Sequence, residues 1–403
     1  MPSSSIWTRR IGALAVGLGL AMSAVMLPCW WTIVRDHRPS CSASKPDFIS
    51  LYTGAKLFST NRPALYNLEQ QRAIQEGIDP SSGDWVLPFF YPPFFAAFLV
   101  PLGWFSFSAA FIAMTLINIA ILVAVIQLLV RRVQLNRQQT YWLMLASFSN
   151  YGVQYGLLEG QTSFIALLLL TLFVFSFRES GSGNSGIWSG FLFFKPQLAG
   201  IPFLILVSNK KWRELGSAFL MLGLLAFISL LSVGVGGVKD YIALSARAAA
   251  GDEYLRIEPE GMHNLRALSY FFLSAPWGDA VWWLGTFLLI ALIVARSRAS
   301  EKPNGNFFTE WITIAAALIL ISPHLHSHDL TLLTIPFAFV LKSAGEAVLP
   351  LVALTLVVLG VFPLINTIAY PHLPPLVPIA LLLFLAIDHW RTGFLRHVLL
   401  IKP

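Results

Sequence analysis

Apolar runs recur along nearly the whole chain and are separated by short polar or charged intervals. Each run approaches the about 20 residues that a helix needs to cross the hydrocarbon core of a bilayer. The pattern predicts an all-α, polytopic membrane helix bundle of about twelve spans, which we treat as a single integral membrane domain over residues 1–403. The expected spans are 11–34, 106–130, 140–156, one ending at Arg178, a short pair on either side of Lys195, 215–234, 280–295, 307–322, 330–341, 347–366 and 375–390.

Two polar intervals are too long to be simple turns between spans, namely 35–92 and 239–268. Within the first, Phe48, Tyr52 and Ala55 recur at helical spacing, which predicts amphipathic interfacial helices. The Pro-rich apolar stretch 93–105 follows and is expected at the membrane interface or re-entering it. We therefore predict two large loops, the first of which holds helices and the chemistry.

The composition supports a membrane protein and orients it. Hydrophobic residues make up 56% of the chain and charged residues 12%, which is too little polar surface to coat a soluble domain of this size. The net charge of +7 is scattered between apolar runs, so nucleic acid is not an expected partner. Arg9 and Arg10 before the first run place the N-terminus inside. We expect both termini in the cytoplasm and both large loops on the outer face of a bacterial inner (plasma) membrane.

Asp47 is the candidate chemical centre of the first loop. It follows a proline and opens the helical pattern from Phe48, so it is positioned as an N-cap. Capping alone would explain an aspartate there. A carboxylate beside the bilayer and an aromatic-rich pocket can instead act as a general base towards a hydroxyl. Both interpretations stay open on the residues alone.

A histidine run, His324-Leu325-His326-Ser327-His328-Asp329, ends a predicted span on the outer face. Only His324 and His328 would share one face of a helix, so a three-ligand zinc site from this run is disfavoured. The run suits recognition of phosphate or hydroxyl groups, with Asp329 fixing a histidine tautomer. Interfacial histidines satisfied by water are the alternative. We predict no metal and no cofactor, since the chain has neither a Cys/His zinc spacing nor a Gly-rich phosphate loop.

Two further polar groups are expected near that face. In Gly261-Met262-His263-Asn264-Leu265-Arg266, the arginine suits a phosphate with paired donors and Asn264 suits sugar hydroxyls, although an arginine at this depth can also snorkel. Lys195, before Pro196 and Gln197, lies between two apolar segments, where its charge needs a partner. A phosphate or Glu159 are the candidate partners of Lys195.

The order of short motifs resembles glycosyltransferase family 87 from about residue 45 to 340. The motifs are Asp47-Phe48, Leu65-Tyr66, Phe90-Tyr91-Pro92-Pro93, Gly160-Gln161, Lys195-Pro196-Gln197, and Ser322-Pro323 with His328-Asp329-Leu330. The resemblance implies the GT-C membrane fold and inverting transfer of a sugar, mannose in such proteins, from a polyprenyl-phosphate donor to an acceptor hydroxyl on the non-cytoplasmic face. It implies that Asp47 is the general base.

The remaining candidates are assigned by charge and position around that base. Thr162-Ser163 stands where the family often has Val-Asn, so the sugar stays open between mannose, another hexose and a pentose. The expected partners are the lipid donor, a lipid or glycan acceptor and the bilayer. For the donor phosphate and sugar the candidates are Lys195, Gln197, His263, Asn264, Arg266, His324, His326 and His328, and for the acceptor pocket Tyr52, Tyr91, Gln161 and Asp329.

Two other functions compete with the transferase. A transporter or flippase of lipid-linked sugars would share the hydropathy and the intramembrane lysine, but it predicts polar groups near the midplane and similar halves. In this chain the polar groups gather on one expected face and no internal repeat is visible. A non-catalytic scaffold that has kept the fold is the third possibility, which activity alone separates from the first.

Overall fold

The computed structural model describes residues 3–36, 46–78, 86–179, 181–249, 261–302, 305–346, 348–369 and 372–392. Within these ranges the chain folds into seventeen α-helices with three short 3-10 helices, and the one β-type pairing is an isolated bridge between Met262 and His326. The prediction of an all-α fold is confirmed.

Among the described residues, five helices are long and apolar enough to cross a membrane, which indicates a multi-pass membrane protein. Shorter apolar helices accompany them, so the predicted polytopic bundle is confirmed, whereas its count of about twelve spans stays a prediction. The long helices are α1 (Ser3–Asp36), α5 (Phe107–Val133), α11 (Trp212–Ala249), α13 (Trp277–Ser300) and α16 (Leu349–Ala369). The shorter apolar helices are α4 (Pro93–Gly103), α8 (Ser163–Arg178), α10 (Pro196–Ser208), α14 (Phe307–Ile321) and α17 (Leu376–Thr392).

Side-chain caps determine where several helices begin. The Ser106 hydroxyl accepts a hydrogen bond from the Ala109 amide at the start of α5. The Asn150 side chain accepts one from the Gly152 amide at 2.7 Å. This cap starts α7 (Tyr151–Leu158) directly after α6 (Arg137–Phe148), so the interval predicted as one span at 140–156 is two short helices.

Helix α11 bends at Gly234, whose φ of 69° is a left-handed conformation that glycine adopts without a Cβ clash. The predicted span 215–234 ends at this bend. The helix then continues to Ala249, so the first part of the predicted loop 239–268 is helical. Residues 250–260 of that loop lie outside the described residues.

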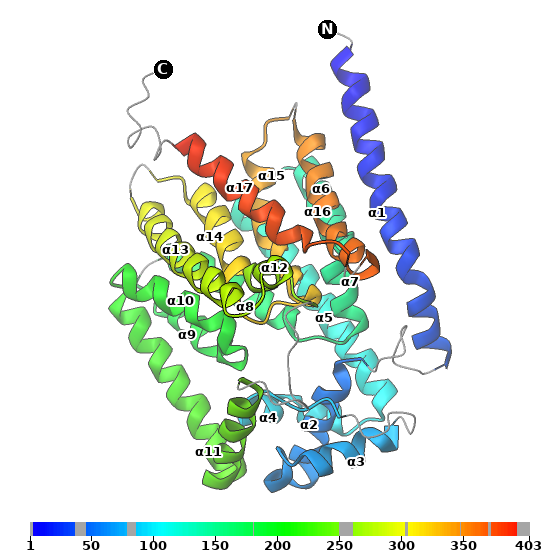
Figure 1. Cartoon of the computed structure of the whole chain (residues 1–403), viewed down its shortest axis with the longest axis vertical. Helices are drawn as coiled ribbons and strands as arrows, with labels where there is room; N and C mark the ends of the chain where they lie inside the picture. Colours follow the sequence, from blue (N-terminus) through cyan, green and yellow to red (C-terminus); the bar gives the residue numbers. More distant parts are fainter. Residues whose placement is uncertain are drawn as a thin grey trace.

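The predicted helices of the first loop are present as α2 (Phe48–Thr60), η1 (Arg62–Ala64) and α3 (Leu68–Ile78). Together with α4 and the last turns of α11 they form one end of the molecule, at the bottom of Figure 1. The first turns of α1 and the last turns of α17 lie toward the opposite end, as expected for two termini on one side of a membrane.

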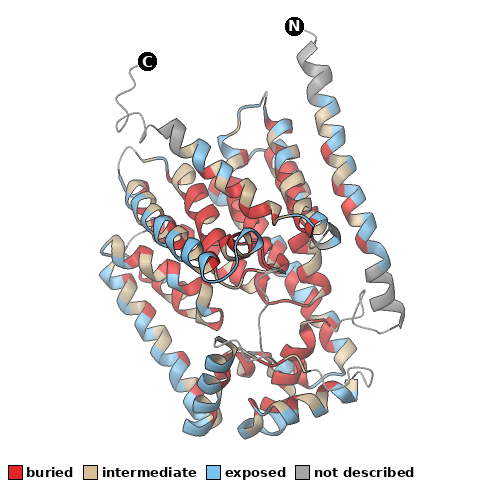
Figure 2. Cartoon of the chain, in the orientation of Figure 1, coloured by how far each residue is buried: buried red, intermediate tan, exposed pale blue. Residues whose placement is uncertain are grey.

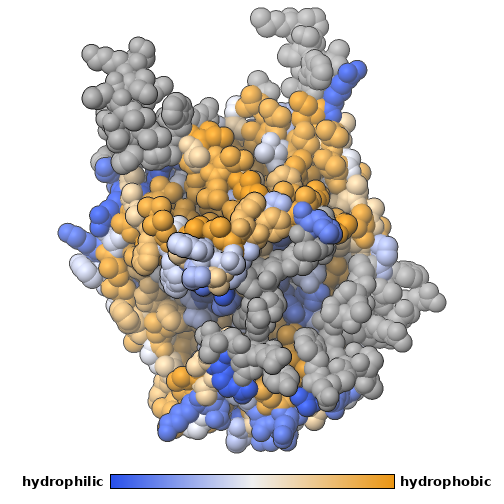
Figure 3. All heavy atoms as spheres, in the orientation of Figure 1, coloured by the Kyte–Doolittle hydropathy of each residue, from blue (hydrophilic) through white to orange (hydrophobic). Residues whose placement is uncertain are grey.

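The surface of the helical bundle is apolar. Buried residues fill the centre of the molecule, and exposed residues cover the outer faces of the long helices (Figure 2). Large hydrophobic side chains are exposed there, such as Leu220 on α11 and Leu288 on α13, at 76% and 64%. Figure 3 shows hydrophobic residues over the upper bundle and hydrophilic ones at the lower end. An apolar belt of this kind is the surface that lipid chains cover.

The remaining elements place polar residues at the centre. Helix α9 (Asn184–Phe191) and η3 (Leu192–Phe194) lead to Lys195 at the start of α10. Helix α12 (Leu265–Phe272) follows the polar segment 261–264, and η5 (Ser327–Leu333) leads into α15 (Thr334–Ser343). The starts of α2, α8, α10, α12 and η5 thus supply the residues of the candidate site.

Candidate active site

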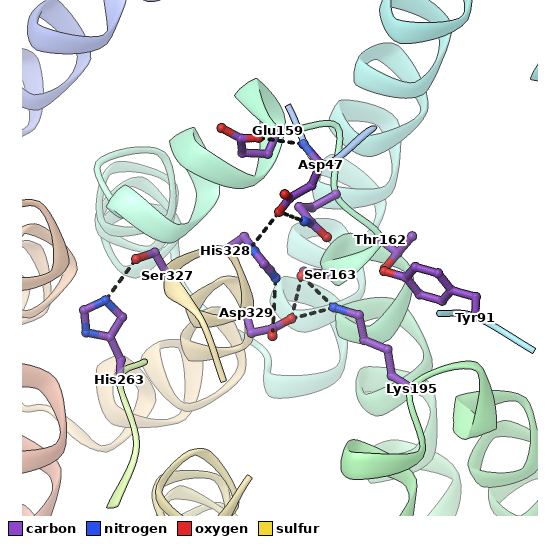
Figure 4. A network of polar contacts seen from close by, with 11 residues as sticks. Asp47, Tyr91, Glu159, Thr162, Ser163, Lys195, His263, Ser327, His328 and Asp329 are labelled. Carbon is purple, nitrogen blue, oxygen red and sulfur yellow. Dashed lines mark hydrogen bonds and ion pairs between the residues drawn. The ribbon is translucent and has the colours of Figure 1, made fainter. Parts of the chain in front are cut away.

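Asp47 occupies the predicted N-cap position of α2 but does not cap the helix with its side chain. Its carboxylate oxygen Oδ2 instead accepts a hydrogen bond from Gln161 Nε2 and lies 3.9 Å from His328 Nδ1. The side chain remains 38% exposed, although the neighbouring Phe48 is fully buried. Capping therefore does not account for Asp47, whose carboxylate is accessible and faces other polar side chains (Figure 4).

The turn between α7 and α8 borders Asp47. Glu159 Oε2 accepts a hydrogen bond from the Asp47 amide at 2.8 Å, and the Glu159 carbonyl accepts one from the Phe48 amide at 2.9 Å. Two residues later Gln161 donates to the Asp47 carboxylate; its assignment to the acceptor pocket stays a prediction. A single turn thus holds both the backbone and the side chain of Asp47.

Lys195 is buried and its partner is Asp329. Its Nζ donates to Asp329 Oδ1 at 2.7 Å and to the Ser163 hydroxyl at 3.1 Å. The expectation that Glu159 might balance Lys195 is wrong, because Glu159 binds the backbone of Asp47. The Ser163 hydroxyl also donates to Asp329 Oδ1 at 2.6 Å, which joins the starts of α8, α10 and η5.

His328 lies between the two aspartates. Its Nε2 contacts Asp329 Oδ2 at 3.5 Å and its Nδ1 faces Asp47. The ring is buried, and Nδ1 has no hydrogen-bond partner among the described residues. A proton held on Nε2 toward Asp329 would leave Nδ1 as a free acceptor, so the role of Asp329 in fixing this tautomer stays a prediction.

Two polar groups far apart in sequence pair along their backbones. The His263 amide donates to the Leu325 carbonyl at 2.9 Å, and the Asn264 side chain donates to the Ser322 carbonyl at 2.7 Å. Asn264 Oδ1 also caps α12 by accepting from the Ala267 amide. Both the nitrogen and the oxygen of the Asn264 side-chain amide therefore bond to the backbone. We do not include Asn264 among the residues proposed to contact the reacting groups.

The paired segments leave several polar atoms buried without a partner. His263 Nε2 contacts the Ser327 hydroxyl at 2.9 Å, but its Nδ1 is unpartnered among the described residues. The same holds for His324 Nδ1 and for Arg266 Nε, whose guanidinium stacks 5.1 Å from the ring centroid of Trp282. Buried polar atoms without a partner are costly, so this cluster is suited to a polar ligand.

Burial determines the protonation of the site. It raises the pKa of Asp47, and it raises that of Glu159 to about 8 with the nearby Asp47 charge adding to the shift. Burial lowers the pKa of His328 to about 3, that of His263 to about 3 and that of His324 to about 4. The histidines are thus neutral at pH 7, so they offer neutral donor and acceptor nitrogens rather than positive charge.

The other candidate residues lie at varied distances from this centre. The Tyr91 hydroxyl bonds to the Thr162 hydroxyl at 2.9 Å beside Lys195 (Figure 4). The Tyr52 hydroxyl donates to the Phe105 carbonyl at 2.9 Å. The His326 ring stacks 5.9 Å from the His328 ring. Gln197 is half-buried in the first turn of α10, and no described contact joins it to the cluster.

The model of glycosyltransferase family 87 matches residues 89–323, which is more than half of the 403-residue chain. The chain belongs to glycosyltransferase family 87. No curated protein and no solved structure matches it. The matched range includes Gln161, Lys195 and Arg266, whereas Asp47 and His328 lie outside it, so their place in this glycosyltransferase rests on the geometry described above.

Several residues of this family 87 site were not found from the sequence. The sequence marks Ser163 only as a departure from the family pattern, and it offers Glu159 only as one of two candidate partners of Lys195. Asn118, which donates to the Gln161 carbonyl at 2.9 Å from the middle of α5, was not considered. The signal for Asn118 and Ser163 is a polar residue inside or at the start of a mostly apolar helix, where an unpaired polar group would be costly.

The residues of the glycosyltransferase site do not suit a metal. Within the described ranges, no group of three or more His, Cys, Asp or Glu side chains gathers closely enough to hold an ion. The neutral histidines near Asp47 contact a serine, an aspartate or one another instead. That the reaction needs no metal stays a prediction.

Proposed function

We propose that this family 87 glycosyltransferase transfers a sugar, with mannose as the first candidate, from a polyprenyl-phosphate donor to an acceptor hydroxyl on the non-cytoplasmic face. Asp47 is the general base in this proposal. The single observation that carries it is the accessible Asp47 carboxylate, held by Gln161 and facing the unpartnered His328 Nδ1. A hydroxyl that donates its proton to Asp47, beside the His328 ring, would be oriented and deprotonated there.

The proposed step is a single displacement. The acceptor oxygen attacks the anomeric carbon, its proton passes to Asp47, and the bond from that carbon to the phosphate oxygen breaks with inversion. The lipid phosphate leaves with the bonding electron pair. Asp47 suits the role because the partial desolvation of its carboxylate raises its pKa, which makes it a stronger base than a fully solvated aspartate.

The donor phosphate fits the cluster of unpartnered atoms on the paired segments. Arg266 supplies a buried Nε–H donor, and His263 and His324 each have an unpartnered Nδ1. A leaving phosphate is stabilised by fixed donors aimed at its oxygens in a site with little water. We assign Lys195 to a different task, because its ammonium already binds Asp329 and thereby holds the aspartate that contacts His328.

The experiment uses the purified full chain in lipid vesicles with radiolabelled polyprenyl-phosphate-mannose and a lipid and glycan extract of the host membranes as acceptor. We expect label to move into the extract, with the anomeric configuration inverted, and to do so equally in the presence of a chelator. Parallel reactions with polyprenyl-phosphate hexose and pentose donors identify the sugar.

Two outcomes would overturn the proposal. Movement of the labelled donor across the vesicle membrane without transfer would indicate a flippase of lipid-linked sugars. Loss of transfer with chelator, restored by a divalent ion, would contradict the metal-free step.

A further inference from the structure

Three successive residues, Glu159, Gly160 and Gln161, contact the start of α2 from one turn. The Glu159 side chain accepts a hydrogen bond from the Asp47 amide at 2.8 Å, and the Glu159 backbone carbonyl accepts one from the Phe48 amide at 2.9 Å. Gln161 donates to the Asp47 carboxylate. We refer to residues 159–161 as the clasp. Figure 4 shows the Glu159 carboxylate directed at the Asp47 backbone on the side away from His328.

The clasp supplies acceptors for two amides at the start of α2. The first amides of a helix lack partners within the helix, and an aspartate at this position normally accepts from one of them. Here Glu159 accepts from the amides of Asp47 and Phe48, while the amides of Ile49 and Ser50 bond to the carbonyls of Pro46 and Asp47. All four amides thus have acceptors without the Asp47 side chain, whose carboxylate faces His328.

Gly160 brings the two segments into close contact. Its φ of 59° is left-handed, and a Cβ on it would lie 2.8 Å from the Cβ of Phe48. The Phe48 ring is fully buried and packs 5.6 Å from the ring centroids of Phe107 and Phe111. The residue after Asp47 is therefore fixed on one side by α5 and on the other by the clasp.

The clasp is itself tied to the rest of the site. The Gln161 carbonyl accepts from Asn118 on α5 at 2.9 Å, and the Gln161 amide donates to the Gly156 carbonyl at 2.9 Å. The next two residues, Thr162 and Ser163, bond to Tyr91 and Asp329. The position of Asp47 is thus linked through one rigid turn to the lysine, the aspartate and the histidine that surround the proposed reacting hydroxyl.

We propose that Glu159 is the positioning residue for the Asp47 base: its side chain accepts from the Asp47 amide at the start of α2 and so fixes where the carboxylate of Asp47 meets the acceptor hydroxyl. The inference rests on the proposed function for its catalytic meaning, but the clasp is a structural claim of its own. A glutamine at this position keeps an oxygen that accepts from the Asp47 amide, whereas an alanine keeps none.

The catalytic test compares Glu159→Ala and Glu159→Gln with the wild type in the vesicle transfer assay. We expect Glu159→Ala to lower kcat about 100-fold, because a small displacement of a catalytic group has effects of that order. The KM for the donor is expected to change less than about twofold, since the residue does not contact the donor. Glu159→Gln should keep kcat within about threefold of wild type, because the acceptor oxygen remains.

The chain offers a matched control. Glu179 follows α8 as Glu159 follows α7, but it is exposed and its described partner is Arg132 on the surface. Glu179→Ala should leave kcat and KM unchanged. Retained kcat in Glu159→Ala would overturn the inference, and so would an equal loss in Glu159→Gln, because the loss would then not come from the missing acceptor oxygen.

Amide hydrogen exchange tests the clasp without activity. The peptide that begins α2 should exchange faster in Glu159→Ala than in wild type, while Glu159→Gln and Glu179→Ala should match wild type. Unchanged exchange in Glu159→Ala would overturn the clasp. If the wild type transfers no sugar from any lipid-phosphate donor, the proposed function fails, and exchange still decides whether Glu159 holds the start of α2.

Discussion

Lys195 and Asp329 form a buried ion pair whose two charges depend on each other. Their side chains are 5% and 4% exposed, and they meet at 2.7 Å. Lys195→Met leaves the Asp329 charge buried without its cation, so we expect the free energy of unfolding to fall by about 3–5 kcal/mol. Lys195→Met/Asp329→Asn should recover much of this loss, because it removes the orphaned charge. Thermal unfolding in detergent measures the stability of the three proteins, which should fall in the order wild type, double variant, Lys195→Met.

The surface pair of Arg132 and Glu179 is the control for that prediction. Its side chains are 46% and 54% exposed, so water and salt screen the two charges. Arg132→Met should cost at most about 1 kcal/mol. A loss in Lys195→Met no larger than in Arg132→Met would contradict the structural importance of the buried pair.

Glu159 gives the stability of the protein a defined dependence on pH. Folding raises its pKa from an ordinary value of 4.5 to about 8, so the folded chain holds this proton more tightly than the unfolded chain. The resulting stabilisation is complete below pH 4.5 and is lost as the pH rises through about 8. The melting temperature of wild type should therefore fall more steeply over this interval than that of Glu159→Gln. A steeper fall in Glu159→Gln would contradict the shift.

Helix α9 approaches α11 so closely that only glycine fits at one point of contact. A Cβ on Gly186 would overlap the backbone carbonyl of Glu214, whereas a Cβ on Gly200 in α10 would meet nothing within 4 Å. Small residues of this kind let membrane helices pack backbone to backbone. Gly186→Ala should destabilise the protein by about 1–3 kcal/mol through overpacking. Gly200→Ala should be neutral or stabilise it by up to about 1 kcal/mol. The melting temperatures of Gly186→Ala and Gly200→Ala test this difference. Equal changes in the two variants would refute the close contact at Gly186.

Most elements were predictable from apolar run length because burial in a bilayer leaves a strong periodic signal. The predicted boundaries at 106–130 and 307–322 lie close to those of α5 and α14. The break at Asn150 was missed, because its cap bond and its contact with the Leu330 carbonyl depend on a distant segment. The extension of α11 beyond Gly234 is not predicted, since several glycines followed by the charged Lys239 usually mark the end of a helix.

The sequence predicts which residues form the site better than it predicts which of them contact each other. Motif order pointed to Asp47, Gln161 and His328, which meet in the structure. The partner of Lys195 was not predictable. An acidic residue at any distance along the sequence can neutralise a buried lysine, and only the fold brings Asp329 into contact with it. The pairing of the segments at 263 and 325 is likewise a backbone contact that carries no sequence signal.

The orientation of the whole molecule follows from its charges and can be measured directly. In a Cys29→Ser/Cys41→Ser background, Gln70→Cys on α3 lies in the first loop and Gln138→Cys on α6 lies near Arg137, both on exposed positions. If the first loop is outside, a membrane-impermeant maleimide should label Gln70→Cys in intact cells and Gln138→Cys only after permeabilisation. The reverse pattern would invert the topology and place the candidate site in the cytoplasm.

The most direct test of the account is the turnover of Asp47→Asn in the vesicle transfer assay at matched protein amounts. Asparagine keeps the shape of the side chain and cannot accept the acceptor proton, so kcat should fall by at least about 100-fold while the melting temperature stays close to wild type. Asp240→Asn, an exposed aspartate in α11 at the same end of the molecule, should retain wild-type kcat. Turnover of Asp47→Asn at the wild-type rate would contradict the assignment of Asp47 as the general base.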